Sequence, residues 1–382
     1  MTVSAFLADR AGPADLLALG EPTHGEPRFA YARNEIFEEL VAAGFRSVAY
    51  ESDRVAGLVA DAYVQGGDLP IEQVLVDGFS HGFGALPGNR ELLEWMRAYN
   101  AGRAQTERLT FHGFDAALEM TGAPSPRRFL AHVLAYVGDH VDPPADLDAL
   151  IGPEERWTDP AAIMDHSRSI GRSPEALRLR AIADDLRTAL YANAPRLVAA
   201  SSLAEWRRAD LHADTAIRLL GYHAEAAAPA LQAVRTSRLL GVRDAWMARN
   251  LLAIRAAEQH RGPTLVFANN RHLQRQPSTW QLAGMDLEWA SAGSIVSALL
   301  GERYAVIIGS LGASAALDLA APQPGTFEAA LPRMGPTLVD RADLTAELTA
   351  NLTMRTDPKP EQGYFPLDAE TVARCDAVLH IP

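Results

Sequence analysis

The sequence predicts an α/β fold, with a largely parallel sheet flanked by helices and a mainly helical insertion. Short apolar runs that end in Gly or polar residues recur along the chain with helical patterns between them, which is typical of a parallel sheet. The middle of the chain has few such runs. We therefore expect an α/β catalytic core over 1–125 and 255–382. A helical insertion over 126–254 is expected to cover the active-site cleft.

Six apolar runs predict the buried strands of the sheet. Between them, the insertion contains stretches such as "SPEALRLRAIADDLRTALYANAP", in which apolar residues recur three and four apart, as on one face of a helix. A Pro-rich stretch at 317–336 predicts a loop. The six predicted strands lie at 15–20, 45–52, 108–115, 263–270, 303–312 and 376–382.

Composition excludes several classes of function. The net charge of −13 argues against nucleic acid or an anionic membrane as a partner. The only cysteine, Cys375, rules out an internal disulfide and a Cys-based zinc site, and the only lysine, Lys359, lies in a Pro-rich loop unsuited to Schiff-base or phosphate chemistry. No apolar run reaches a bilayer-spanning length, and the N-terminal residues lack the basic region of a signal peptide. We expect a cytoplasmic protein with a small-molecule substrate, and the sequence leaves its oligomeric state open.

Ionisable or amide side chains follow four of the predicted strands. Ligands of open α/β sheets bind beyond the carboxyl ends of the strands, so these side chains predict a site there. A single carboxylate at a strand end is more often a helix N-cap, but four strands together favour a site. The residues are Glu21 and His24 after the first strand, Glu51 after the second, Asp115 after the third, and Asn269, Asn270 and His272 after the fourth.

Arg33 interrupts the apolar face of a helix predicted to start near Pro27. The residue therefore points inward, where a guanidinium needs an anionic partner. Two interpretations stay open, and both can hold together. Arg33 either forms a structural salt bridge to Glu51 or Asp115, or it anchors the substrate or stabilises an oxyanion in the site.

The sequence "GFSHG" at 78–82 matches the nucleophile elbow of serine hydrolases, with Ser80 as the nucleophile. That motif needs a strand before the serine and a helix starting at it. Here three glycines and a proline follow within seven residues, which breaks the motif. We expect no serine nucleophile.

A catalytic metal is not favoured by the pattern of ligand types. Glu21, His24, Glu51 and His272 are possible zinc ligands, yet no HExxH motif and no close ligand pair on one helix is present. We expect no cofactor and no metal, although a catalytic divalent ion stays an alternative.

The chain resembles the erythromycin esterase family in an ordered set of short segments. These are "GEPTHGE", "RNEIF", "VAYESD", "AYVQGG", "ELLEWMRAYN", "FHGFDA", "VRDAWMARN" and "ANNRHLQR", and they run from about residue 15 to the C-terminus. The resemblance implies an α/β core with a helical insertion. It also implies a hydrolase that opens the lactone ester of a macrolide antibiotic without a covalent intermediate, and hence a role in antibiotic resistance.

The resemblance also implies roles for individual residues. His24 would activate water as the general base, with Glu51 and Glu21 orienting it, and Arg33 would be essential. A large apolar cleft would hold the substrate, with Trp157, Trp206 and Trp246 as candidates to line it, although each suits a plain core position as well. We expect the substrate to contact Asp115, His112 and Arg271.

One position departs from the family pattern, which reads His-Asn-x-His after the fourth strand. Asn269 stands in this chain at the first histidine, and Asn does not take up a proton near neutral pH. The change is engineered, or the homologue has different or slower chemistry, or His272 carries the role. Other readings are a tailoring enzyme of natural-product biosynthesis, acting on another ester or peptide, and a macrolide-binding protein impaired in catalysis.

Overall fold

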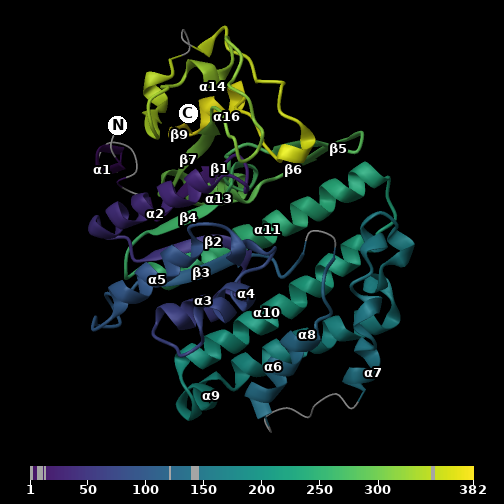
Figure 1. The fold of residues 1–382 in the computed structure, drawn as a ribbon. Coiled ribbons are helices and arrows are strands. Elements are labelled where there is room, and N and C mark those ends of the chain that lie inside the picture. The colour runs from purple at the N-terminus through teal and green to yellow at the C-terminus, as the bar shows by residue number, and fades with distance from the viewer. Residues whose placement is uncertain (1–2, 7–11, 13, 120–121, 139–145, 346–348) are drawn as a thin grey trace. The chain divides into compact units, whose positions relative to one another are not determined.

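The computed structural model describes residues 3–6, 12, 14–119, 122–138, 146–345 and 349–382. Their contacts divide the chain into two compact units. One unit contains residues 1–115, 244–280 and 288–382, and the other contains 116–243 and 281–287. Figure 1 shows the strands of the main sheet lying side by side in the first unit.

The first unit contains a seven-stranded sheet in the order β3-β2-β4-β1-β7-β9-β8. Its neighbouring strands pair in parallel, except that β8 runs antiparallel to β9. This confirms the predicted α/β class with a largely parallel sheet. The strands are β1 (Leu16–Glu21), β2 (Ser47–Asp53), β3 (Thr110–Asp115), β4 (Thr264–Asn269), β7 (Tyr304–Leu311), β8 (Thr337–Asp340) and β9 (Ala377–Ile381).

All six predicted strands are present, each within two residues of its expected limits. The sequence patterns missed β8 and the hairpin of β5 (Ser278–Leu282) and β6 (Met285–Trp289). Strand β8 has only four residues and lies at the edge of the sheet, and the hairpin alternates between exposed and covered positions. Neither therefore produces the long apolar run of a central strand.

Apolar side chains from both faces of the sheet enter two separate cores. Leu17 and Leu19 of β1 pack into one core, whereas Leu16 and Ala18 pack into the other, because successive side chains of a strand point to opposite faces. The first core receives α2 (Pro27–Ala42), α3 (Gly57–Val64), α4 (Ile71–Asp77) and α5 (Asn89–Asn100). The second receives part of α11 (Gln232–Glu258) with α12 (Asn270–Leu273), α13 (Ala292–Leu300) and α16 (Ala369–Arg374). The short helices α1 (Val3–Phe6) and α14 (Phe327–Ala330) complete the described helices of this unit.

The second unit is mainly helical. Its longest helices, α8 (Pro174–Ala192) and α10 (Leu203–Ala226), pack against each other, and apolar residues on them such as Leu179, Leu186 and Leu219 are buried. Trp157 and Trp206 donate indole hydrogen bonds to the carbonyls of Ile151 and Leu190, so both serve this unit's own packing. That the helical unit covers the site stays a prediction. Its helices are α6 (Arg127–Val137), α7 (Leu147–Ile151), α8 (Pro174–Ala192), α9 (Ala194–Ala200), α10 (Leu203–Ala226) and the first part of α11.

None of the helices in the described ranges combines the length and the apolarity that a membrane crossing requires.

Candidate active site

Two carboxylates and a histidine meet where β1 and β2 end. His24 follows β1, and its Nδ1 lies 2.8 Å from Oε1 of Glu21, the last residue of that strand. Its Nε2 lies 3.7 Å from Oε1 of Glu51 in β2. The parallel strands β1 and β2 both pair with β4, so their carboxyl ends open at the same edge of the sheet. The carboxylate at hydrogen-bond distance from His24 is thus Glu21, and Glu51 lies farther away.

His272 completes the cluster from the other side of Glu51. Its Nε2 lies 3.3 Å from Oε1 of Glu51, and its Nδ1 lies 2.5 Å from Oδ1 of Asp244 in α11. The indole N–H of Trp289 donates to the second oxygen of Asp244. Asp244 and Trp289 were not among the predicted site residues, although "VRDAWMARN" contains the aspartate.

Asn269 supports this cluster through its backbone and its amide. The Asn269 N–H donates to Oε2 of Glu51 over 2.7 Å, and its Oδ1 accepts from the N–H of Arg271 over 3.0 Å. Asn269 is therefore the N-cap of α12, a position at which Asn is among the preferred residues. The structure gives the position a structural function that does not need a histidine.

The neighbouring Asn270 joins the site to the rest of the sheet. Its amide donates to the carbonyl of Gly309 in β7 over 2.8 Å and accepts from the N–H of the same residue over 2.9 Å. A Cβ at Gly20 would lie 2.1 Å from Oδ1 of Asn270, so the hydrogen bonds between Asn270 and Gly309 require glycine at position 20 of β1.

Burial and charge shift the pKa values of the three central groups. Burial raises the pKa of Glu21, against the hydrogen bond from His24. Burial alone lowers the pKa of His24, but the Glu51 and Glu21 carboxylates outweigh it and the pKa is raised. For His272 burial is likewise outweighed, here by Asp244 and Glu51, which raise its pKa to about 10. His272 is therefore an imidazolium at neutral pH.

Of the cluster's side chains, only His24 is substantially open to solvent. Its side chain is 35% exposed, against 10% for His272 and 3% for Glu51. A cavity of about 30 Å³ lies beside it, lined by residues that include Glu21, His24, Tyr50 and Phe267. One or two water molecules fit such a volume.

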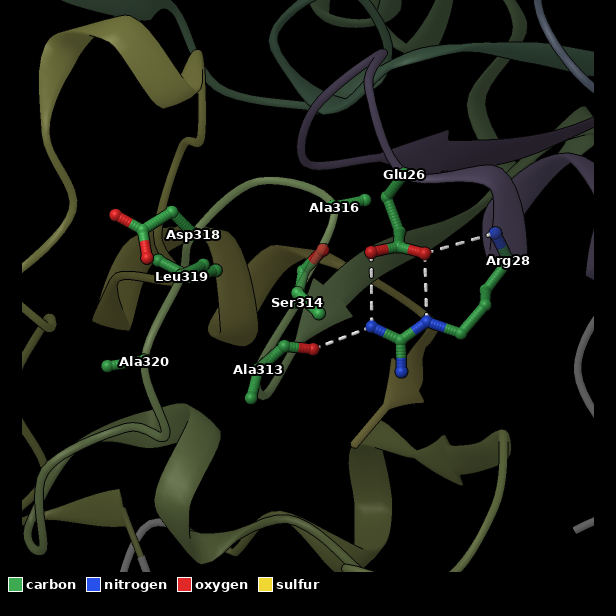
Figure 2. Close-up of a pocket in the computed structure, with 9 residues that line it drawn as sticks. Glu26, Arg28, Ala313, Ser314, Ala316, Asp318, Leu319 and Ala320 are labelled. Carbon is green, nitrogen blue, oxygen red and sulfur yellow. Dashed lines mark hydrogen bonds and ion pairs between the residues drawn. The ribbon is translucent and has the colours of Figure 1, made fainter.

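A larger hollow of about 510 Å³ shares Glu26 with this small cavity. Figure 2 shows Glu26 and Arg28 paired side by side at its wall, with Oε1 of Glu26 2.8 Å from Nε of Arg28. Arg28 also donates to the carbonyl of Ala313 over 2.6 Å, which joins it to the loop that contains Ala313. The volume of this open hollow falls in the range of small-molecule sites.

Arg33 is fully buried, as its place in α2 predicts, but its hydrogen bonds go to neutral oxygens. It donates to the amide oxygens of Asn34 and Asn89 and to the carbonyl of Gly88. Its guanidinium lies 4.9 Å from the ring centre of Phe267 and 5.4 Å from that of Tyr50, two rings that line the small cavity. Arg33 thus lies behind the cavity wall, where its charge lowers the pKa of Glu21 against the effect of burial.

Of the predicted substrate contacts, His112 lies away from this cluster. Nε2 of His112 is 2.9 Å from Glu258, which Arg261 also binds, and Arg261 donates to Thr110 at the start of β3. His112 therefore belongs to an ion-pair group toward the amino end of its strand. Asp115 does lie at the carboxyl end of β3, where its Oδ2 is 3.1 Å from Nε2 of His81.

His81 is a further residue that the sequence patterns did not single out. It has the left-handed φ of 57°, which is rare for a residue other than glycine. Its ring contacts Phe83, which the ring of His24 contacts as well, at centroid distances of 5.4 and 4.8 Å.

Ser80 lacks the setting of a nucleophile, as its sequence context predicts. It follows α4 instead of a strand, and its Oγ accepts from the N–H of Asp53 over 2.9 Å. Its own N–H donates to Oγ of Ser52 over 2.8 Å. Ser80 therefore joins its loop to the end of β2.

Within the described ranges, no three His, Cys, Asp or Glu side chains converge as metal ligands would. The expectation of a metal-free reaction stays a prediction.

The fold and the site together define an α/β protein with an acid–histidine centre suited to moving a proton at the carboxyl edge of the sheet. The erythromycin esterase family model matches residues 41–382. The chain belongs to the erythromycin esterase family, which supports hydrolase chemistry of the esterase class and a small-molecule substrate. The match includes Glu51, Asp244 and His272, whereas Glu21 and His24 precede it.

Solved structures of similar fold share 18% sequence identity with the chain. A Bacillus cereus protein has a TM-score of 0.68, with 100% of this chain and 92% of that chain covered. A His-to-Asn variant of the erythromycin esterase EreC, in its open conformation, has a TM-score of 0.69 and coverage of 99% and 93%. A succinoglycan biosynthesis protein has a TM-score of 0.66 and coverage of 97% and 88%. No protein of curated function matches the sequence.

Proposed function

We propose that the chain is a carboxylic ester hydrolase that opens the lactone of an erythromycin-like macrolide by general-base activation of water. The observation that carries the proposal is the Glu21–His24 pair, whose histidine is exposed beside a cavity large enough for water. Membership of an esterase family supports the reaction class.

His24 suits the role of the base. The carboxylate of Glu21 accepts a hydrogen bond from the Nδ1–H group of His24. This leaves Nε2 of His24 to take a proton from water, as in acid–histidine pairs of other hydrolases. The hydroxide then attacks the ester carbonyl, and the protonated His24 returns its proton to the alkoxide that leaves. The products are a carboxylate and an alcohol, with no covalent intermediate.

His272 suits a different role, because its pKa of about 10 keeps it protonated at neutral pH. In the proposal it does not replace a missing base. It holds Glu51 in place beside His24, and its positive charge favours the negative charge that develops on the carbonyl oxygen.

The hollow of about 510 Å³ beside Glu26 is the proposed place for the body of the substrate. It shares Glu26 with the cavity at His24, so a ligand there would reach toward the base.

The test is mass spectrometry of erythromycin A incubated with the protein and, in parallel, with Asn269→His. A gain of one water with both proteins supports the proposal and shows that Asn269 is tolerated. The matched control is His24→Ala, which should show no gain while melting at the temperature of the unmodified protein. Turnover by His24→Ala would refute the assignment of the base.

A second candidate is a macrolide-binding protein impaired in catalysis, and the observation that favours it is Asn269. In that case erythromycin A gains water only with Asn269→His, while the unmodified protein binds the antibiotic without changing it. If neither protein adds water to erythromycin A or binds it, the substrate is a different ester, as the tailoring-enzyme alternative requires.

A further inference from the structure

Arg271 differs from two other arginines of its unit, Arg275 and Arg355, in having no acidic partner in contact. Arg275 and Arg355 each lie 2.6 Å from a carboxylate, Asp376 and Asp357 respectively. In the described part of the chain the Arg271 side chain makes no hydrogen bond or ion pair, and its Nε is buried without a partner. Arg271 is partly buried, and a guanidinium that is partly removed from water without a counter-ion favours binding an anion from outside the chain.

The carboxylate of Asp368 acts on the charge of Arg271 but is not a counter-ion in contact with it. Asp368 acts on it only at longer range, and burial keeps the pKa of Arg271 below its usual value. The carboxylate of Asp368 is already used as the N-cap of α16, where it accepts from the N–H of Thr371 over 2.7 Å.

The guanidinium is held in place beside the catalytic loop. It lies 4.7 Å from the ring centre of Phe365, whose ring contacts that of Trp280. The N–H of Phe365 donates over 2.9 Å to the carbonyl of Pro22, which lies between Glu21 and His24. The backbone of Arg271 is fixed as well, because its N–H donates to Asn269 and its carbonyl accepts from Ser278.

We propose that Arg271 binds a carboxylate of the ligand, with Phe365 and Trp280 forming an aromatic wall beside it. A guanidinium matches a carboxylate through two parallel hydrogen bonds, which an ammonium group does not reproduce. The carboxylate belongs either to the substrate itself or to the acid formed when the ester is cleaved. The proposal rests on the esterase function and adds the chemistry of the group recognised at this end of the site.

The test begins with binding, which does not depend on turnover. Calorimetry with the full chain compares 3-phenylpropionate with its neutral amide, 3-phenylpropanamide. We expect the acid to bind about tenfold more tightly or better, and Arg271→Gln to abolish this difference. The control Arg374→Gln removes an exposed arginine that pairs with Glu370 and should keep it. An equal affinity for acid and amide, or a preference that survives in Arg271→Gln, would overturn the proposal.

A measurement on the unmodified protein guards against a Gln variant that folds poorly. Affinity for 3-phenylpropionate should fall as the salt concentration rises, while affinity for the amide should not. An affinity for the acid that is independent of salt would overturn the proposal. His24→Ala should keep the preference for the acid while losing turnover, so failure of the esterase function and failure of the Arg271 proposal are distinguishable.

Kinetics then separate the two sources of the carboxylate. If the substrate carries it, Arg271→Gln raises KM for the monomethyl ester of glutaric acid and leaves KM for the dimethyl ester unchanged. If the product carries it, Arg271→Gln weakens inhibition by the product acid and leaves KM for both esters unchanged. Unchanged KM together with unchanged product inhibition would overturn the proposal.

Discussion

Oδ1 of Asp244 lies 2.5 Å from Nδ1 of His272, which couples a residue of α11 to a histidine of α12, the short helix that follows β4. The other oxygen of Asp244 accepts the indole N–H of Trp289. Since Nε2 of His272 faces Glu51, a line of charged groups runs from Asp244 to Glu51 and on to His24. Asp244 is therefore a positioning residue for the proposed reaction.

Asp244→Asn tests this role. The amide keeps the shape but removes the negative charge, so the pKa of His272 should fall from about 10. We expect kcat to fall about 10- to 100-fold, as for groups that orient a reacting centre. Kinetics on an accepted ester and an NMR titration of His272 measure the two effects. The exposed Asp185→Asn should change neither, and an unaltered His272 pKa in Asp244→Asn would contradict the coupling.

The sequence contained the signal for Asp244, because Asp244, Met247 and Leu251 share one face of α11 and the other two are buried. An acid on an apolar helix face is the same pattern that identified Arg33. The residues before 255 were predicted to belong to the insertion, and for that reason Asp244 was not among the predicted site residues. In the structure, residues 244–280 belong to the unit that contains the sheet.

The strand-end rule predicted the Glu21, Glu51 and His272 cluster because parallel strands end at the same edge. His112, which was predicted as a substrate contact from inside the third strand, lies away from that edge, since it comes three residues before the end of β3, about 10 Å back along the strand. The position of a residue within its strand, and not its type, decides whether its side chain lies at this edge of the sheet. The partners of Arg33 could not be predicted either, since Asn89 and Gly88 come from a distant turn.

Stability should depend on pH through His272. Its folded pKa of about 10 lies above the ordinary value of 6.5, so the imidazolium stabilises the fold fully below about pH 6.5. That contribution is lost as the pH rises toward 10. Urea unfolding should therefore show the free energy of unfolding falling between these pH values, by an amount on the order of a few kcal/mol. His272→Gln should flatten this part of the profile, and an equal slope in both proteins would refute the assignment.

The rate of ester hydrolysis should report the pKa of His24. That pKa is raised above 6.5, so kcat/KM should rise with pH and level off only above this value, as the base loses its proton. Glu51→Gln removes a charge that raises the pKa of His24, so the rising part of the profile should move to lower pH. A shift to higher pH, or none, would contradict the electrostatic role of Glu51. Measuring the profile for the same ester in both proteins keeps the comparison free of substrate effects.

Ser80→Ala separates structural from catalytic function in the "GFSHG" segment. The hydroxyl of Ser80 accepts a hydrogen bond from the buried N–H of Asp53, and the alanine substitution removes that hydrogen bond. We expect a loss of about 0.5–1.5 kcal/mol in the free energy of unfolding, measured by urea titration. Turnover of an accepted ester should persist, because His24 and its carboxylates do not depend on the hydroxyl. Covalent labelling of Ser80 by a phosphonate, together with complete loss of activity in Ser80→Ala, would instead establish a serine esterase. The expected combination, a less stable protein that still hydrolyses the ester, is one that a catalytic serine does not produce.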